Sequence, residues 1–133
     1  MEVETQLIVQ YPDLLGEGPQ YDAAHDRLLW VDILGHKVRE ARPTAGGGWA
    51  TGATLEPGEL VAAVVPRRGG GLLAMVRTRV LALPEDGSES SVFASFDWPD
   101  DHTMRLNDAK CDPQGRLVVG WVVFDGSRLG RVD

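Results

Sequence analysis

The chain is poor in cysteine and has no long apolar run, and both shortages exclude whole classes of protein. Cys111 is the single cysteine among 133 residues, so neither a disulfide framework within the chain nor a cysteine-based zinc site can form. No apolar run approaches the roughly 20 residues that span a bilayer. Residues 1–6 are acidic and lack the basic and apolar regions of a signal peptide. We therefore expect a soluble, cytoplasmic protein with no membrane partner.

Basic residues are also scarce. The 13 lysines and arginines face 20 aspartates and glutamates, which gives a formal net charge of −7. An acidic chain without a basic stripe argues against nucleic acid as the main partner. The acidic excess is compatible with cation binding, although a merely solvated acidic surface has the same composition.

Helical periodicity is a third absence. Glycine and proline interrupt the chain every few residues, and no long window shows the apolar period of an amphipathic helix. Apolar runs are instead short, rich in β-branched residues and separated by turns. These runs cover residues 28–31, 60–65, 71–76, 80–83 and 117–123. Their spacing predicts an all-β antiparallel protein.

Three of the apolar runs repeat at a nearly constant interval. They begin at Leu28, Leu72 and Leu117, so the intervals are 44 residues (28 to 72) and 45 residues (72 to 117). A period of roughly 40–50 residues with about four strands is typical of a β-propeller blade. We predict blades over residues 14–55, 59–95 and 105–133, which make about two and a half.

A closed propeller typically needs about 4–8 blades. We therefore expect a partial β-propeller, the N-terminal part of a longer protein or a truncated reading frame. A small β-sandwich is the competing architecture, because it would need no further blades.

Two polar residues hold equivalent places in the repeat. Glu17 lies five residues before Asp22, and Asn107 lies five residues before Asp112. Both would start the innermost strand of a blade, at the rim of the central channel. A carboxylate and an amide oxygen are hard ligands that suit Ca²⁺, Mg²⁺ or Mn²⁺. The corresponding place in the second repeat falls near Val61, which offers nothing polar.

Structural explanations compete with these roles. Glu17 could be a solvated turn carboxylate, and Asn107 could cap a turn through its side chain. Arg105, which lies two residues before Asn107, could likewise be a surface arginine paired with Asp100 or Asp101.

Two other aspartates are expected to be structural. Asp108 follows Asn107 on a strand, so it should face the other way and bond to neighbouring backbone. Asp32 ends an apolar run and could approach the channel, but a turn role is favoured.

The sequence resembles the N-terminal part of the SMP-30/gluconolactonase/regucalcin (LRE-like) family of six-bladed propellers. The matching stretches are G-E-G-P at 16–19, L-L-W-V-D-I at 28–33 and R-L-N-D-A-K-C-D-P-Q-G-R at 105–116. They cover most of this chain but only about the first half of a full-length family member. Their order and spacing carry the signal, because G-E-G-P alone would be weak.

The resemblance implies hydrolysis of a small-molecule sugar lactone, assisted by one divalent metal ion (Ca, Zn, Mn or Mg) in the channel. Glu17 would match a metal ligand, and Arg105 and Asn107 would match residues that contact the substrate. The family's other ligands and its general base come from later blades, beyond Asp133. No catalytic residue is therefore expected within this chain, and we expect it to bind metal weakly and to hydrolyse little or nothing alone.

Trp121 departs from the small residue that often follows the equivalent of Gly120 in the family. Its bulk could narrow the channel mouth or fill the blade. The alternative function is non-catalytic: a calcium-binding or interaction module that self-associates through exposed blade edges.

Overall fold

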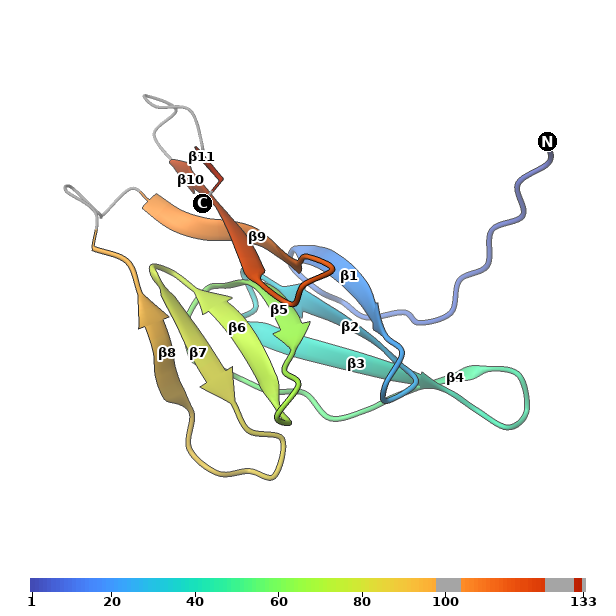
Figure 1. Ribbon diagram of the computed structural model, residues 1–133. Coiled ribbons are helices and arrows are strands. Elements are labelled where there is room, and N and C mark those ends of the chain that lie inside the picture. The colour runs from blue at the N-terminus through green and yellow to red at the C-terminus, as the bar shows by residue number, and fades with distance from the viewer. Residues whose placement is uncertain (98–103, 124–130, 133) are drawn as a thin grey trace.

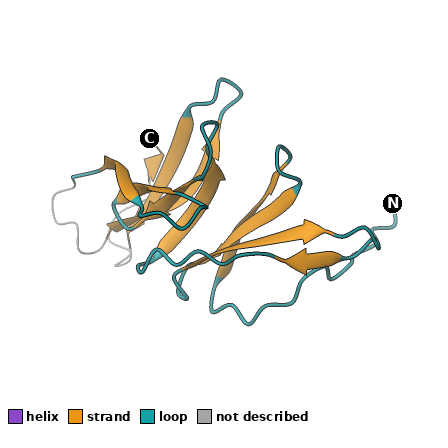
Figure 2. Cartoon of the chain, turned by 90° about the horizontal axis from the view of Figure 1, so that it is seen from below, coloured by secondary structure: helices purple, strands orange, loops and turns teal. Residues whose placement is uncertain are grey.

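The computed structural model describes residues 1–97, 104–123 and 131–132, and every regular element in these ranges is a strand. Eleven strands form three antiparallel sheets (Figures 1 and 2). The predicted all-β class is thus confirmed. None of the described residues belongs to a helix that is long and apolar enough to cross a membrane.

Each sheet is a meander in which strands that follow one another in the chain pair with one another. The first sheet contains β1 (Gly16–Asp22), β2 (Arg27–Asp32), β3 (Lys37–Pro43) and β4 (Trp49–Thr51). The second contains β5 (Val61–Pro66), β6 (Leu72–Val76), β7 (Arg79–Leu83) and β8 (Ser91–Ser95). The third contains β9 (Met104–Cys111), β10 (Leu117–Val123) and β11 (Arg131–Val132).

The second sheet lies between the other two, and its sequence shows why. All residues of β6 are buried, whereas buried and half-buried residues alternate along most of β2. Leu72 of β6 belongs to a core shared with Leu29 and Val31 of β2. Met75, on the opposite face of β6, belongs to a second core with Leu106 of β9. A strand that is apolar on both sides needs a partner sheet on each face.

The first strands of the three sheets are neighbours in space. β5 contacts both β1 and β9, so the innermost strands run along one side of the stack (Figure 1). Polar residues at the starts of these strands are therefore brought together, although they are far apart in the sequence.

An ion cluster around Arg27 joins the first two sheets. The Arg27 side chain is only 3% exposed, and its Nε donates a hydrogen bond to Asp22 Oδ2 at 2.9 Å. Its Nη1 donates to Glu40 Oε2 at 2.9 Å, and its guanidinium also binds Glu85, which follows β7 in the second sheet. Glu85 and the other two carboxylates raise the pKa of Arg27, although burial opposes them. One guanidinium thus satisfies three acidic side chains.

We predict that Arg27→Met lowers the free energy of unfolding by about 3–5 kcal/mol, because it leaves the buried Asp22 carboxylate without its guanidinium partner. The control is Lys37→Met, since Lys37 pairs with Glu56 at the surface. That pair should contribute less than about 1 kcal/mol. Urea unfolding at neutral pH measures both changes, and equal costs would show that the Arg27 cluster adds nothing beyond a surface ion pair.

Candidate functional site

A cavity of about 200 Å³ lies at the starts of the innermost strands and gathers the predicted site residues. Glu17 of β1, Arg105 of β9 and Asn107 of β9 all line it. Its remaining lining residues are Leu15, Gly18, Ile33, Ala62 and Asp108. Acidic, basic and amide side chains from two sheets therefore converge on one cavity, which makes it the candidate site.

A larger hollow of about 540 Å³ lies at 67–72 and 82–86, with Ser91 on its wall. Its walls include three consecutive glycines and a proline, so backbone forms much of its surface. Its polar side chains, Arg67, Glu85, Asp86 and Ser91, all belong to the second sheet or its connecting loops, so it does not join separate sheets.

All three innermost strands carry a register shift near the candidate site. In β1 the shift falls between Glu17 and Gln20, and in β5 it falls between Val61 and Ala63. In the β9–β10 pair it falls between Val119 and Trp121 of β10. Such bulges place an extra residue in one strand and re-aim its side chains.

The bulge in β9 changes where Asp108 points. Leu106 pairs with Trp121 and Ala109 pairs with Val119, so both Asn107 and Asp108 lie opposite one residue. Both are exposed, and both line the cavity. The expectation that Asp108 faces away from Asn107 is therefore wrong, because strict alternation applies only to a regular strand. The expected bond to backbone is present, since Ala109 N donates to Asp108 Oδ1 at 2.8 Å.

Gly18 supplies the backbone conformation of the bulge in β1. Its φ is +59°, in the left-handed region that favours glycine. Its N–H donates to Glu17 Oε2 at 3.3 Å, so the bulge also contacts the carboxylate of the candidate ligand.

Arg105 is the positive charge of the cavity. Its Nη1 donates to Asn107 Oδ1 at 2.9 Å and to the Leu106 carbonyl at 3.0 Å. Burial lowers the pKa of Arg105, and the charge of Glu17 opposes that shift. The guanidinium nevertheless stays protonated, as arginine does in proteins. The alternative pairing of Arg105 with Asp100 or Asp101 involves residues outside the described ranges.

Asp32 anchors the segment that leads to Glu17. It is 2% exposed and accepts hydrogen bonds from the N–H groups of Leu14 (3.1 Å), Leu15 (3.0 Å) and Gly35 (2.9 Å). The favoured turn role of Asp32 is confirmed by the Gly35 bond. The spacing of an aspartate three residues before a glycine could signal that turn. The bonds to Leu14 and Leu15 carry no signal in the sequence, because they cross a gap of 17 or 18 residues.

Asp13, which the sequence did not single out, holds the same segment from the other side. Its Oδ2 accepts a hydrogen bond from Trp30 Nε1 at 2.8 Å, and its Oδ1 accepts from Arg39 Nη2 at 2.8 Å. The Arg39 guanidinium also lies 4.0 Å from the centre of the Tyr11 ring. The segment 11–15, which directly precedes β1 and Glu17, is therefore fixed against the first sheet.

The donor set fits one side of a site for a hard divalent cation. Glu17 and Asp108 bring carboxylates to the cavity wall, and carboxylate oxygens are the ligands that such ions prefer. The amide oxygen of Asn107 instead accepts a hydrogen bond from Arg105. The described parts of the chain hold no group of three or more histidine, cysteine, aspartate or glutamate side chains suited to a metal ion. Glu17 would therefore hold an ion together with groups that these residues do not supply.

Trp121 belongs to the packing of the blade. It is partly buried against the second core, next to Leu106 and Val119. Its apolar ring thus adds to the packing of the second core, which the second and third sheets share.

The fold is a partial β-propeller, and a cavity lined by polar residues lies at the starts of its innermost strands. A model of the SMP-30/gluconolactonase/LRE-like region matches residues 15–131. The chain belongs to this family, and the resemblance found in the sequence is confirmed.

Curated relatives include lactonases. The chain is 33% identical over 121 residues to a pentonolactonase from Haloferax volcanii and 29% identical over 137 residues to a 6-deoxy-6-sulfogluconolactonase from Pseudomonas putida. It is 28% identical over 127 residues to regucalcin from Danio rerio. These matches cover 90%, 100% and 92% of this chain but 39%, 45% and 40% of the relatives. The chain thus spans less than half the length of these proteins.

Solved structures confirm the propeller fold. A luciferin-regenerating enzyme matches with a TM-score of 0.73 at 24% identity, over 86% of this chain and 38% of that one. A calcium-binding protein, regucalcin, from Agrobacterium tumefaciens matches with a TM-score of 0.72 at 23% identity, over 92% of this chain and 40% of that one. The competing β-sandwich is therefore excluded.

We predict that Gly18→Ala lowers the free energy of unfolding by about 1 kcal/mol, because alanine disfavours a positive φ. No atom lies within 4 Å of a methyl group added at Gly18, so the cost is conformational and not steric. Gly46→Ala is the control, since a methyl group there also meets nothing within 4 Å and Gly46 has no positive φ. Urea unfolding should separate the two variants, and indistinguishable midpoints would contradict the prediction.

We also predict a specific acid sensitivity at Asp32. Burial opposes its charge, but the N–H groups of Leu15, Gly35 and Leu14 outweigh burial and hold its pKa below the ordinary value of 3.8. The unfolded chain therefore binds this proton more tightly than the folded chain does. The stabilisation is complete above 3.8 and is lost as the pH falls through the folded pKa.

The measurement compares the wild type with Asp32→Asn by urea unfolding across this pH range. The difference in unfolding free energy should stay constant above pH 3.8 and narrow below it. A difference that widens on acidification would reverse the assigned direction of the pKa shift.

Proposed function

We propose that the protein is a divalent-metal-dependent hydrolase of sugar lactones, and that this chain supplies one side of its site. The observation that carries the proposal is the convergence of Glu17, Arg105 and Asn107 on one cavity at the end of the innermost strands. The lactonases among the relatives support the substrate class. The relatives and neighbours that are named regucalcin, one of them called calcium-binding, support the cation.

Each residue has a distinct part in this proposal. Glu17 would hold the cation through its carboxylate. A bound divalent cation would polarise the lactone carbonyl and lower the pKa of a bound water molecule. Arg105 would donate hydrogen bonds to substrate hydroxyls or to the oxyanion that develops on the carbonyl oxygen.

Asn107 would orient that arginine. Its Oδ1 accepts a hydrogen bond from Arg105 Nη1 at 2.9 Å. This bond fixes one nitrogen of the guanidinium and so defines the direction in which the planar group points. The amide would also contribute a polar group to the cavity wall beside the substrate. A planar cationic donor held in this way is pre-organised for an anionic oxygen, since little reorganisation remains when charge develops.

The groups needed for catalysis are divided between this chain and the rest of the family fold. The described residues offer carboxylates at Glu17 and Asp108, but hard cations usually take six or more oxygen ligands, some of them from water. We propose that the remaining protein ligands and the general base belong to the part of the family fold that this chain does not span. The 133 residues alone should then bind cations weakly and hydrolyse lactones little.

We predict that Glu17→Gln removes most of the Mn²⁺ affinity of this chain, because it removes the carboxylate that is proposed to hold the cation. The matched control is Glu4→Gln, which makes the same change of charge in the exposed N-terminal segment. Free Mn²⁺ is measured by its paramagnetic resonance signal. Equal affinities of the two variants would refute the cation role of Glu17.

The catalytic half of the proposal is tested with gluconolactone. The purified 133-residue chain should hydrolyse it no faster than buffer does, while a chain extended to the full family length should turn it over when a divalent cation is added. Turnover by the 133 residues at the rate of the extended chain would overturn the divided site.

A further inference from the structure

The path of the chain into β1 is held by a carboxylate that the proposed function does not use. Asp32 ends β2, and its backbone pairs with Gly16, while Val31 pairs with Glu17. Its side chain reaches the two residues before that pairing begins, at Leu14 and Leu15. Asp32 therefore contacts the segment immediately before Glu17.

Leu15 is fixed through both of its backbone polar groups. Its N–H donates to Asp32 Oδ1 at 3.0 Å, and its carbonyl accepts from Ile33 N at 2.9 Å. Leu15 itself lines the cavity, two residues before Glu17. The position at which Glu17 enters the cavity thus depends on a hydrogen-bonded frame made by residues 32 and 33.

The neighbouring turn leaves room for this carboxylate. A methyl group built on Gly35 would lie 2.0 Å from Asp32 Oδ2, so glycine is needed for the carboxylate to keep its place. A buried carboxylate is costly unless hydrogen bonds compensate it, and three backbone N–H groups do so here. A neutral side chain would cost less free energy to bury. The presence of a carboxylate therefore indicates that this place requires a group able to accept hydrogen bonds from three N–H groups.

We infer that Asp32 is a positioning residue for Glu17: it fixes Leu14 and Leu15 so that the Glu17 carboxylate faces the Arg105 side of the cavity. The inference rests on the proposed role of Glu17. Asp32 itself does not line the cavity, and it acts through the backbone. An asparagine in its place keeps the size but turns one acceptor oxygen into a donor that faces an N–H group.

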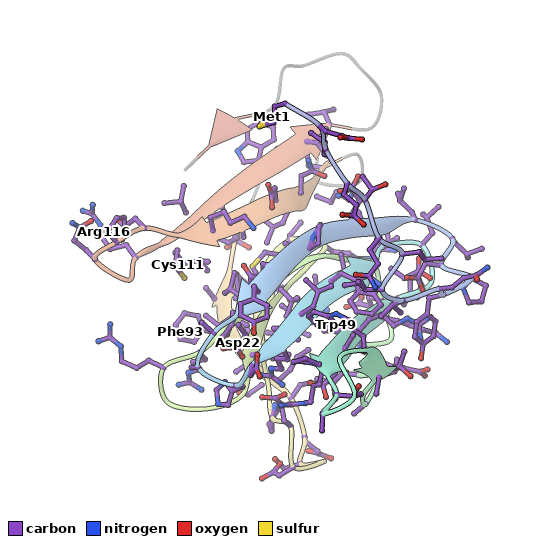
Figure 3. All side chains as sticks on the ribbon, turned by 90° about the vertical axis from the view of Figure 1, so that its right-hand side faces the viewer. Met1, Asp22, Trp49, Phe93, Cys111 and Arg116 are labelled. Atoms are coloured by element: carbon purple, nitrogen blue, oxygen red, sulfur yellow. The ribbon has the colours of Figure 1, made fainter. Side chains whose placement is uncertain are left out.

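The test compares Asp32→Asn with Asp22→Asn in the full chain. Asp22 is also buried and lies at the opposite end of β1 (Figure 3). There it accepts a hydrogen bond from Arg27. Asp32→Asn should speed hydrogen exchange at the amides of Leu15 and Ile33 and shift the amide resonances of Glu17 and Gly18. It should also weaken Mn²⁺ binding, because the Glu17 carboxylate would lose its fixed place in the cavity.

Asp22→Asn should lower stability without moving these amide signals or the Mn²⁺ affinity. If both variants change the Glu17 and Gly18 signals equally, the effect is general loosening and the inference is overturned. It is also overturned if folded Asp32→Asn keeps the wild-type signals.

A second variant covers the case in which Asp32→Asn does not fold. Gly35→Ala displaces the carboxylate but keeps its charge, and it should produce the same shifts at Glu17 and Gly18. The wild type provides a third check, since the amides of Leu14 and Leu15 must exchange more slowly than those of the exposed residues 2–7. Exchange of Leu14 and Leu15 at the unprotected rate would overturn the inference without any variant.

Failure of the proposed function has a different signature. If wild-type protein shows no Mn²⁺-dependent broadening of the Glu17 and Gly18 amides, the cation role fails. The positioning of Glu17 by Asp32 is then decided by the amide shifts and the hydrogen exchange, which need no metal.

Discussion

The second sheet has two apolar faces, and both must be buried. Leu72 and Met75 point to opposite sides of β6, and each is at the centre of a separate core. The first and third sheets cover these faces, and this arrangement brings β1 and β9 to either side of β5. The candidate site follows from it, because Glu17 and Arg105 come within one cavity only when both sheets pack on the second.

Polar interactions fix the path of the chain into β1, which apolar packing alone does not determine. Packing of Leu29 and Val31 fixes the distance between sheets, but it does not fix where the chain enters β1. Two carboxylates, the partly buried Asp13 and the buried Asp32, do so through directional hydrogen bonds. At the other end of the same hairpin, Arg27 ties the first sheet to Glu85 of the second. Each end of β1 is thus held by a buried ionic group.

The elements of the fold could be predicted from the sequence because the signal for each strand lies within the strand and its flanking turns. The run at 71–76 is apolar throughout and bounded by glycine and arginine, and it recurs at a constant interval. The meeting of Glu17, Arg105 and Asn107 could also be predicted, from the repeat and from the family motif. The orientation of Asp108 could not, because a bulge depends on pairing between strands and has no marker within the strand itself. The anchoring of Leu14 and Leu15 by Asp32 was equally hidden, since it joins residues that are distant in the chain.

The bulge in β9 has a consequence for how such a protein can change. It separates Asn107 and Asp108, which line the cavity, from Leu106 and Ala109, which pack in the second core. A substitution at Asn107 or Asp108 can therefore alter the cavity wall while Leu106 and Ala109 keep their buried places. The cavity wall and the core are thus formed by separate sets of positions in this strand, so a change in one set need not disturb the other.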